Sequence, residues 1–171
     1  KTYYVAPSGN NAYIGTIGSP WATFQYAFDH VTAGDTVYFR GGIYFITSTQ
    51  HKSDLVGTAA NPICFFNYPG EVPIIDGINA TSFVTGIMIE HSYFVHIKGI
   101  TIRNCLQISP PSSGYDTPSG IYMYRPHNCT IENCTAYNIG YRGFYVMSPD
   151  TVYIINCDAY NCVNTKVYGN E

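Results

Sequence analysis

Charged side chains are scarce in this chain, since only 11% of its 171 residues are Asp, Glu, Lys or Arg, against roughly 25% in an average soluble domain. The 8 Lys and Arg form no basic run, and the formal net charge is −3. A protein that holds nucleic acid through its phosphates needs a concentrated cationic surface. The sequence therefore disfavours a nucleic-acid partner.

Long apolar runs are also absent, because no stretch approaches the ~20 residues of a membrane-spanning helix. None of the 6 cysteines belongs to a CxxC pair and the 5 histidines are scattered, so no zinc site is expected. What the chain has instead is Tyr, Asn and Gly in abundance. This charge-poor, β-prone composition favours a secreted or cell-surface protein.

A six-residue motif occurs twice, with one substitution, in the second half of the chain. NCTAYN at residues 133–138 returns as NCDAYN at residues 156–161. The motif belongs to a longer unit of constant length that occurs three times without internal gaps, at 86–105, 120–139 and 143–162. Self-similarity at a fixed short period is typical of stacked structural units.

Apolar residues alternate with others along each unit, which is the period of a β-strand. The aligned units place apolar residues in common columns, for example Ile97 with Ile131 and Ile154. Three short strands per unit, with Gly or Asn at the corners, are typical of one rung of a parallel β-helix. The sequence predicts an all-β fold, a right-handed parallel β-helix with a short N-terminal capping helix. We expect one β-helix domain over 1–171, with the cap at 1–34 and the rungs at 35–171.

Asparagines occupy the expected corners between strands. One column holds Asn104, Asn138 and Asn161, and another holds Gly99, Asn133 and Asn156. Asparagine tolerates the left-handed backbone of a tight corner. Its amide can also bond to the asparagine one rung away and so satisfy buried turn groups. We therefore expect an asparagine ladder.

The cysteines have two interpretations. An even number in a secreted chain favours disulfides. However, the repeat stacks Cys134 directly on Cys157 with parallel side chains, which is poor geometry for a bridge. The repeat favours buried free thiols that act as small apolar residues, and one or two disulfides remain the alternative.

A short amphipathic helix is expected near the N-terminus. Apolar residues recur at helical spacing through residues 20–31, among them Trp21, Phe24 and Phe28. Ser19, followed by proline, fits an N-cap and a first helical residue. Because the end of a solenoid needs a cover, this helix is predicted to close it.

Five stretches, taken in order, resemble the N-terminal part of right-handed β-helix polysaccharide lyases. They are VAPSGN, GSPWATFQYAF, AGDTVYFRGGIY, NPICFFNYPGEVPIIDG and the NC-x-AYN corner, and they extend over nearly the whole chain. The resemblance is to polysaccharide lyase family 9 in particular, the pectate lyase-like enzymes. It implies a secreted enzyme that cleaves uronate-containing, pectin-like polysaccharide by β-elimination.

The resemblance also implies calcium and a base. In such lyases several Asp residues hold a calcium ion that binds the substrate carboxylate, and a lysine removes the proton. The family's Asp cluster starts in an ADGF-like segment, continues in an SDDGF-like one and precedes the lysine. This sequence contains neither segment and stops at KVYGNE, 166–171. We therefore expect this chain to be the N-terminal portion of a longer β-helix, with the metal site and base beyond residue 171. We expect no catalytic residue, no calcium held by this chain alone, and no activity from it alone.

Outward positions next to the expected metal site supply the candidate binding residues. They are Tyr122, Tyr124, Arg125, Arg142 and Tyr145. Tyr faces can stack on sugars and Arg can pair with a carboxylate, so these residues are candidates to bind an acidic polysaccharide. The alternative is a surface column of Tyr that stacks between rungs. Glu171 is a weak candidate metal ligand.

Three function classes remain open. The first is the N-terminal part of a calcium-dependent polysaccharide lyase. The second is a non-catalytic β-helix module for carbohydrate binding or surface adhesion. The third, a β-helix glycoside hydrolase, needs paired carboxylates on one face, and none is visible in the sequence. A further expected partner is another chain that covers the open C-terminal end of the stack.

Overall fold

The computed structural model describes residues 1–108 and 117–163, which form three sheets of parallel strands. The six-stranded sheet contains β1 (Thr2–Val5), β2 (Thr36–Phe39), β5 (Ile63–Asn67), β8 (Val95–Lys98), β11 (His127–Glu132) and β14 (Asp150–Ile155), in that order. The four-stranded sheet contains β4 (Gln50–Ser53), β7 (Ile87–Glu90), β10 (Ser119–Tyr124) and β13 (Arg142–Met147). The five-stranded sheet contains β3 (Gly42–Phe45), β6 (Pro73–Asp76), β9 (Thr101–Arg103), β12 (Thr135–Ile139) and β15 (Asp158–Cys162).

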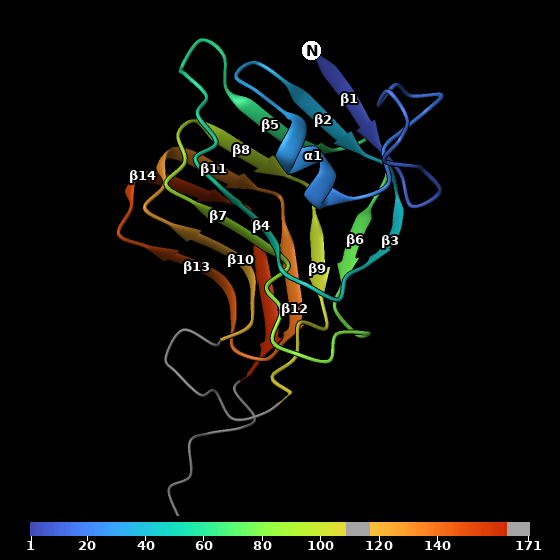
Figure 1. Cartoon of the computed structure of the whole chain (residues 1–171). Coiled ribbons are helices and arrows are strands. Elements are labelled where there is room, and N and C mark those ends of the chain that lie inside the picture. Colours follow the sequence, from blue (N-terminus) through green and yellow to red (C-terminus); the bar gives the residue numbers. More distant parts are fainter. Residues whose placement is uncertain (109–116, 164–171) are drawn as a thin grey trace, which may run out of the picture.

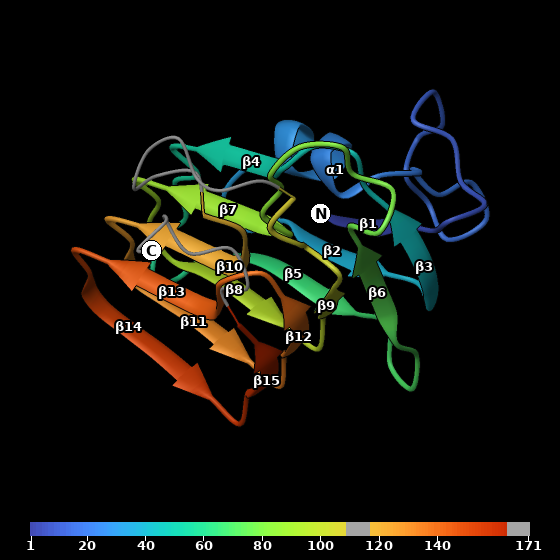
Figure 2. The same ribbon diagram turned by 90° about the horizontal axis from the view of Figure 1, so that it is seen from below.

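The chain visits the three sheets in the same order in every turn. The turns are β4-β5-β6, β7-β8-β9, β10-β11-β12 and β13-β14-β15. Figure 1 and Figure 2 show these turns stacked on one another, with α1 and β1 at one end and β13 to β15 at the other. Each of the three repeated units of the sequence is one complete turn. The predicted parallel β-helix is confirmed.

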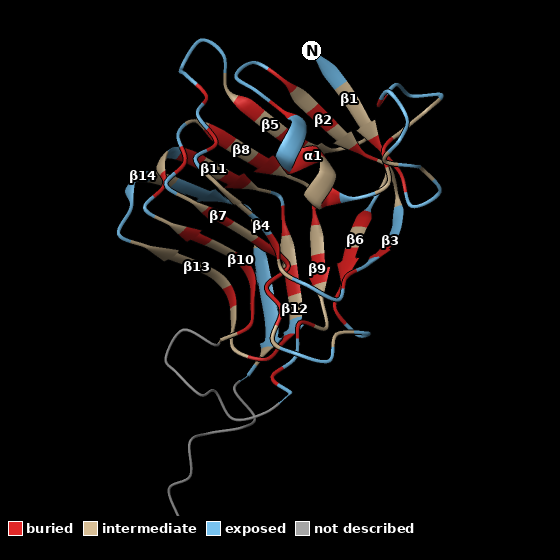
Figure 3. Ribbon diagram, viewed as in Figure 1, coloured by how far each residue is buried: buried red, intermediate tan, exposed pale blue. Residues whose placement is uncertain are grey.

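The strand register is the one that the repeat predicts. Ile121 pairs with Ile87 and with Phe144 in the four-stranded sheet, and Ile131 pairs with Ile97 and Ile154 in the six-stranded sheet. In the inner turns these columns are fully buried (Figure 3). Because residues two apart point to the same face of a strand, the alternate residues of every strand face outward. The outward columns are therefore fixed by the same register.

The capping helix exists but begins later than predicted. Helix α1 spans Phe24–His30, and its N-cap is Thr23, whose hydroxyl accepts a hydrogen bond from the Tyr26 N–H at 3.2 Å. The predicted Ser19 cap is wrong, because Trp21 is extended and bridges Val5. The turn that contains β2 and β3 contributes no strand to the four-stranded sheet. Helix α1 takes that position and contacts β4.

The buried face of α1 closes the apolar interior. The ring of Phe24 stacks on that of Phe39 with centroids 3.7 Å apart, and Phe28 packs edge-on against Phe65 at 4.8 Å. Burying such rings stabilises the fold by roughly 1.5–3 kcal/mol for each side chain. The helix therefore covers one end of the stack, as the sequence predicts.

The corner asparagines take the backbone conformation that the sequence predicts. Asn104, Asn138 and Asn156 have φ of 56°, 52° and 50°. The Asn156 amide donates to the Asn133 side-chain oxygen at 2.7 Å, and the Asn138 amide donates to Asn104 at 3.4 Å. These bonds link successive turns at two separate corners.

All six cysteines lie among the described residues and none forms a disulfide. Cys105 and Cys129 are fully buried. Burial raises the pKa of the Cys105 thiol to about 12. The pKa of Cys134 is also raised, by the neighbouring Cys157 sulfur and by burial. Cys105, Cys129 and Cys134 are therefore buried thiols of the core, whereas Cys64, Cys157 and Cys162 are half-buried. Separately, no helix in the described ranges is long and apolar enough to cross a membrane.

Candidate functional site

The outer face of the four-stranded sheet carries two columns of outward side chains. One column is His51, Met88, Tyr122 and Tyr145, and the other is Ser53, Glu90, Tyr124 and Met147. The Tyr122 and Tyr145 rings stack with centroids 5.0 Å apart and an interplanar angle of 13°. The columns run across four turns, so this face is a continuous strip of side chains along the stack.

Arg142, the first residue of β13, holds its guanidinium over two aromatic rings. Its guanidinium carbon is 4.0 Å from the Tyr141 ring centroid and 3.9 Å from that of Tyr145. One guanidinium nitrogen also donates to the Tyr141 hydroxyl at 2.9 Å. Within residues 1–108 and 117–163, no carboxylate lies within ion-pair distance of Arg142. Arg142 is therefore a positioned cation without an anionic partner in that part of the chain.

A hollow of about 260 Å³ opens beside Arg142. It is lined by Arg142, Tyr145 and Tyr122 together with Met88, Thr85 and Ser119, among others. Burial raises the pKa of Tyr122, and the neighbouring Tyr145 and Glu90 raise it further. The Tyr122 hydroxyl therefore stays protonated at neutral pH and can donate a hydrogen bond. The hollow combines a cation, flat rings and hydroxyl groups, the set that a saccharide carboxylate and ring can use.

The structure brings together only three of the five candidate binding residues. Arg142, Tyr122 and Tyr145 line one hollow. Tyr124 and Arg125 lie at the far end of β10, where the Arg125 guanidinium carbon is 5.3 Å from the Tyr124 ring centroid and Tyr124 packs edge-on against His91. The role of all five in substrate binding stays a prediction.

Sequence reasoning missed Tyr141. Its ring contacts the Arg142 guanidinium, as the ring of Tyr145 does. The signal was present as the adjacent pair Tyr141-Arg142. However, Tyr141 precedes β13 and belongs to no column of the repeat, so alignment of the units did not select it.

A cluster of side chains that could hold a metal ion was sought among the described residues. No group of three or more His, Cys, Asp or Glu lies close enough together among them to hold one. Calcium takes about six to eight oxygen ligands, several of them from carboxylates. The one carboxylate on the outer face of the four-stranded sheet, Glu90, accepts from His51 at 2.7 Å. Glu171, the weak candidate ligand, lies outside the described residues.

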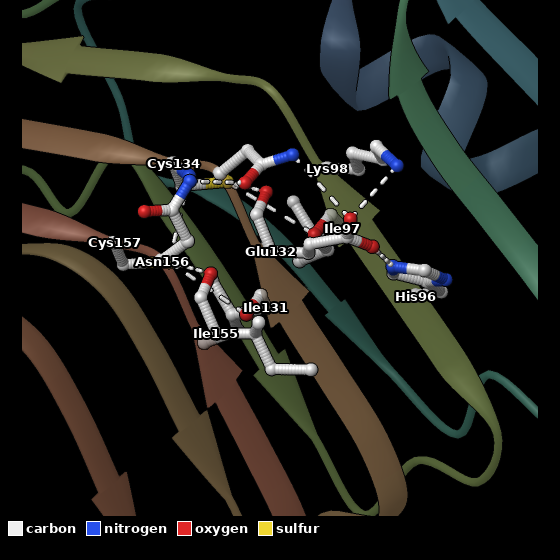
Figure 4. A network of polar contacts seen from close by, with 10 residues as sticks. His96, Ile97, Lys98, Ile131, Glu132, Cys134, Ile155, Asn156 and Cys157 are labelled. Atoms are coloured by element: carbon white, nitrogen blue, oxygen red, sulfur yellow. Dashed lines mark hydrogen bonds and ion pairs between the residues drawn. The ribbon is translucent and has the colours of Figure 1, made fainter.

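A polar network on the six-stranded sheet links three turns (Figure 4). The Glu132 carboxylate accepts from the Lys98 ammonium at 2.8 Å and from the His96 ring at 2.9 Å. The Asn133 amide donates to the same carboxylate at 3.4 Å, and Asn156 of the next turn donates to Asn133. Lys98 and Glu132 are register partners in β8 and β11. The bond from Lys98 lowers the pKa of Glu132, and His96 lowers it further.

The lowered pKa of Glu132 gives the folded chain a dependence on pH. Because the folded pKa lies below the ordinary value of 4.5, the ionised carboxylate stabilises the fold above that pH. The contribution is lost as the pH falls through the folded pKa. We expect Glu132→Gln to be less stable than the wild type at pH above 4.5, and the difference to shrink in more acidic solution. Urea unfolding at a series of pH values checks this.

Lys98→Met is the matched control for that series. This variant removes the Lys98 ammonium, the main cause of the lowered pKa of Glu132. Its free energy of unfolding should therefore change less steeply with pH in acid solution than that of the wild type. A difference between wild type and Glu132→Gln that stays constant down to the most acid pH would contradict the expectation.

The chain matches the profile of the family described as "Pel9A-like, right handed beta helix region" over residues 3–171. The protein of Emericella nidulans named "Pectate lyase PEL9" is 45% identical over 74 residues, which cover 43% of this chain and 18% of that protein. "Uncharacterized protein YwoF" of Bacillus subtilis is 34% identical over 123 residues, which cover 70% of this chain and 25% of that protein. The chain thus spans a quarter or less of the length of these relatives.

Solved structures share the fold. A "Rhamnogalacturonan lyase" matches with a TM-score of 0.63 at 19% identity, over 99% of this chain and 60% of that one. The pectate lyase Pel9A matches with a TM-score of 0.61 at 19% identity, over 91% of this chain and 46% of that one. The GH136 lacto-N-biosidase from Eubacterium ramulus reaches 0.72 at 14% identity, over 92% of this chain and 34% of that one. Proteins with lyase and with biosidase names share this architecture, so the fold alone does not select the chemistry.

Proposed function

Because the chain belongs to the family with a Pel9A-like right-handed β-helix region, we propose that it is part of a secreted polysaccharide lyase. The proposed substrate is an acidic, uronate-containing polysaccharide of the pectin type, cleaved by β-elimination. The observation that carries the proposal is the family match, which extends over residues 3–171. The identity to a protein named pectate lyase points the same way.

The outer face of the four-stranded sheet supports the choice of an acidic substrate. Arg142 contacts the rings of Tyr141 and Tyr145, and its guanidinium can pair with a carboxylate through two parallel hydrogen bonds. The apolar face of a sugar ring can pack on the Tyr122–Tyr145 stack. In this proposal the chain binds and orients a uronate residue at the hollow beside Arg142. Tyr124 and Arg125 would contact a more distant part of the same polysaccharide.

The chemistry itself is assigned to residues outside the described ranges. A calcium ion would stabilise the charge that develops on the substrate carboxylate, and no group of described residues fits it. We propose that the ligands and the base lie past residue 171 in a longer protein, because the matches cover only 18% and 25% of the two relatives' own lengths. In that protein, further turns or another chain would cover the apolar column that ends at Ile154, which is 49% exposed in the last described strands.

The test begins with the reading frame past Glu171 and the intact mass of the purified protein. The longer protein should form unsaturated uronate ends from polygalacturonate when calcium is present and lose this activity with a chelator. The 171-residue chain should form none. Saturated reducing ends would indicate a hydrolase and overturn the lyase proposal. Elimination by the short chain would refute the placement of the site.

A non-catalytic carbohydrate-binding module is the second candidate. The observation that favours it is that no His, Asp, Glu or Lys is among the described residues that line the Arg142 hollow. Saturable binding of an acidic oligosaccharide, without cleavage by any longer form of the protein, would put this candidate first.

A further inference from the structure

A second, larger hollow lies at the corner between the six-stranded and five-stranded sheets. Its volume is about 740 Å³, and its lining includes Tyr38, Phe66, Lys98, Thr101, Asn133 and Thr135. We call it the corner groove. None of its lining residues takes part in the hollow beside Arg142. It is therefore a separate feature of the surface.

The corner groove is elongated along the stack. Tyr38 lies in β2, Phe66 in β5, Lys98 in β8 and Thr135 in β12, so the lining comes from four successive turns. Turns in such a stack are about 4.8 Å apart, and the lining therefore extends about 14 Å. A linear polymer that lies parallel to the stack fits this shape better than a compact small molecule.

One wall of the groove is aromatic. Tyr38 packs edge-on against Phe66 at 6.3 Å and against Tyr68 at 6.1 Å. Tyr4 extends this surface, stacked on Tyr38 at 5.9 Å with an interplanar angle of 26°. Phe66 is only half-buried although it is apolar and points outward. Flat apolar rings on an open surface suit the C–H faces of an extended chain of sugars.

The opposite side of the groove offers hydrogen-bonding groups. Thr101 and Thr135 are register partners in β9 and β12, so their hydroxyl groups follow one another along the stack. Asn133 adds an amide at the corner. Aromatic walls with a few ordered hydroxyl and amide groups are typical of sites that bind a ligand rich in hydroxyls.

The charges in the corner groove are already neutralised. The lining contains one cation, Lys98, and one anion, Glu71. Lys98 pairs with Glu132 at 2.8 Å (Figure 4), and Glu71 pairs with Arg40 at 2.7 Å and accepts from the Gly41 N–H. A uronate chain would find no unpaired cation here, in contrast to the hollow beside Arg142. The charge balance selects an uncharged occupant.

We propose that the corner groove is a second saccharide-binding site, which takes an extended, uncharged chain of β-linked hexoses. This proposal goes beyond the proposed lyase function, because the corner groove would bind a neutral polysaccharide on a different surface and would take no part in cleavage. Together the two sites would hold the protein where acidic and neutral polysaccharides occur side by side.

The test is a titration of the isotope-labelled chain with cellohexaose, followed by nuclear magnetic resonance. The expected result is saturable shifts at the amides of the groove residues. The double variant Thr101→Val, Thr135→Val keeps β-branched residues in both strands and removes two hydroxyl groups. It should weaken cellohexaose binding about tenfold, the effect of one to two lost hydrogen bonds. Thr130→Val, a half-buried outward threonine of the same turn outside the groove, is the matched control and should bind as the wild type does.

Two further titrations separate this site from the proposed function. Arg142→Gln should bind cellohexaose as the wild type does, whereas hexagalacturonate should leave the groove amides unshifted. The proposal is overturned if cellohexaose gives no shifts at the groove, if Thr130→Val weakens binding as much as the double variant, or if hexagalacturonate binds the groove more tightly than cellohexaose. None of these outcomes depends on whether a longer protein is a lyase.

Discussion

Replacing Arg142 by glutamine is expected to weaken binding of hexagalacturonate by about tenfold to a hundredfold, the effect of losing hydrogen bonds to a charged group. The reason is geometric. The guanidinium contacts the rings of Tyr141 and Tyr145 and donates a hydrogen bond to the Tyr141 hydroxyl, so Arg142 loses little conformational freedom when it pairs with a uronate carboxylate. Glutamine keeps some polarity but has neither the charge nor the planar fork. Titration of the chain with hexagalacturonate at low salt measures the change.

Two control variants sharpen this prediction. Arg142→Lys keeps the charge but loses the stacking between two rings, so it should fall between wild type and Arg142→Gln. Arg125→Gln removes an exposed arginine that lies near one ring only, at 5.3 Å, and should have a smaller effect. Equal binding by wild type and Arg142→Gln would remove Arg142 from the site and return the tyrosine columns to a purely structural role.

Replacing Asp76 by alanine is expected to lower the free energy of unfolding by about 3 kcal/mol, because it leaves buried polar groups without their partner. The Asp76 side chain is 3% exposed. It accepts from Arg103 at 2.6 Å, from the Asn104 amide at 2.9 Å and from the Ile78 N–H at 3.0 Å. Arg103 in turn donates to the Tyr137 hydroxyl at 3.2 Å. The carboxylate thus links β6, β9 and β12, and urea unfolding measures the loss.

A double-mutant cycle with Arg103→Met separates the pair from its surroundings. If the cost of Asp76→Ala comes from an unpaired Arg103, the double variant should be less destabilised than the sum of the two single variants. Asp76→Asn keeps the shape and an acceptor for the Ile78 N–H, so it should be less destabilising than Asp76→Ala. Additive effects in the cycle would show that Arg103 does not depend on Asp76.

The turns of the solenoid could be predicted because each one obeys the same local rules. Each strand alternates inward and outward residues, and each corner needs a residue that accepts positive φ. The column of Ile97, Ile131 and Ile154 is therefore visible in the sequence and appears unchanged as register partners. Strand β4 was not foreseen, because QHKS is polar. Its backbone is held by β7 and by Gln25, whose side chain bonds the N–H and C=O of His51.

The start of α1 shows where local signals were misleading. Ser19 followed by proline is a good N-cap pattern, but Trp21 pairs with the first strand. Its N–H donates to Tyr4, its carbonyl accepts from Ala6, and its ring stacks on Tyr3 at 4.4 Å. These contacts with the first strand hold residue 21 extended. The helix therefore begins after the next available cap, Thr23.

The sequence by itself determined the periodic part of this protein: the parallel turns, the inward columns, the corner asparagines and the family to which the chain belongs. These are properties of a repeat in which each unit contacts only its neighbours, so a pattern read along the chain is also the pattern in space. Only the tertiary structure decided the rest. The contact of Tyr141 with Arg142 involves a residue outside the repeat columns. The corner groove is lined by side chains that come from two different sheets. Such contacts arise from side-chain direction and packing between turns, which spacing along the chain does not specify.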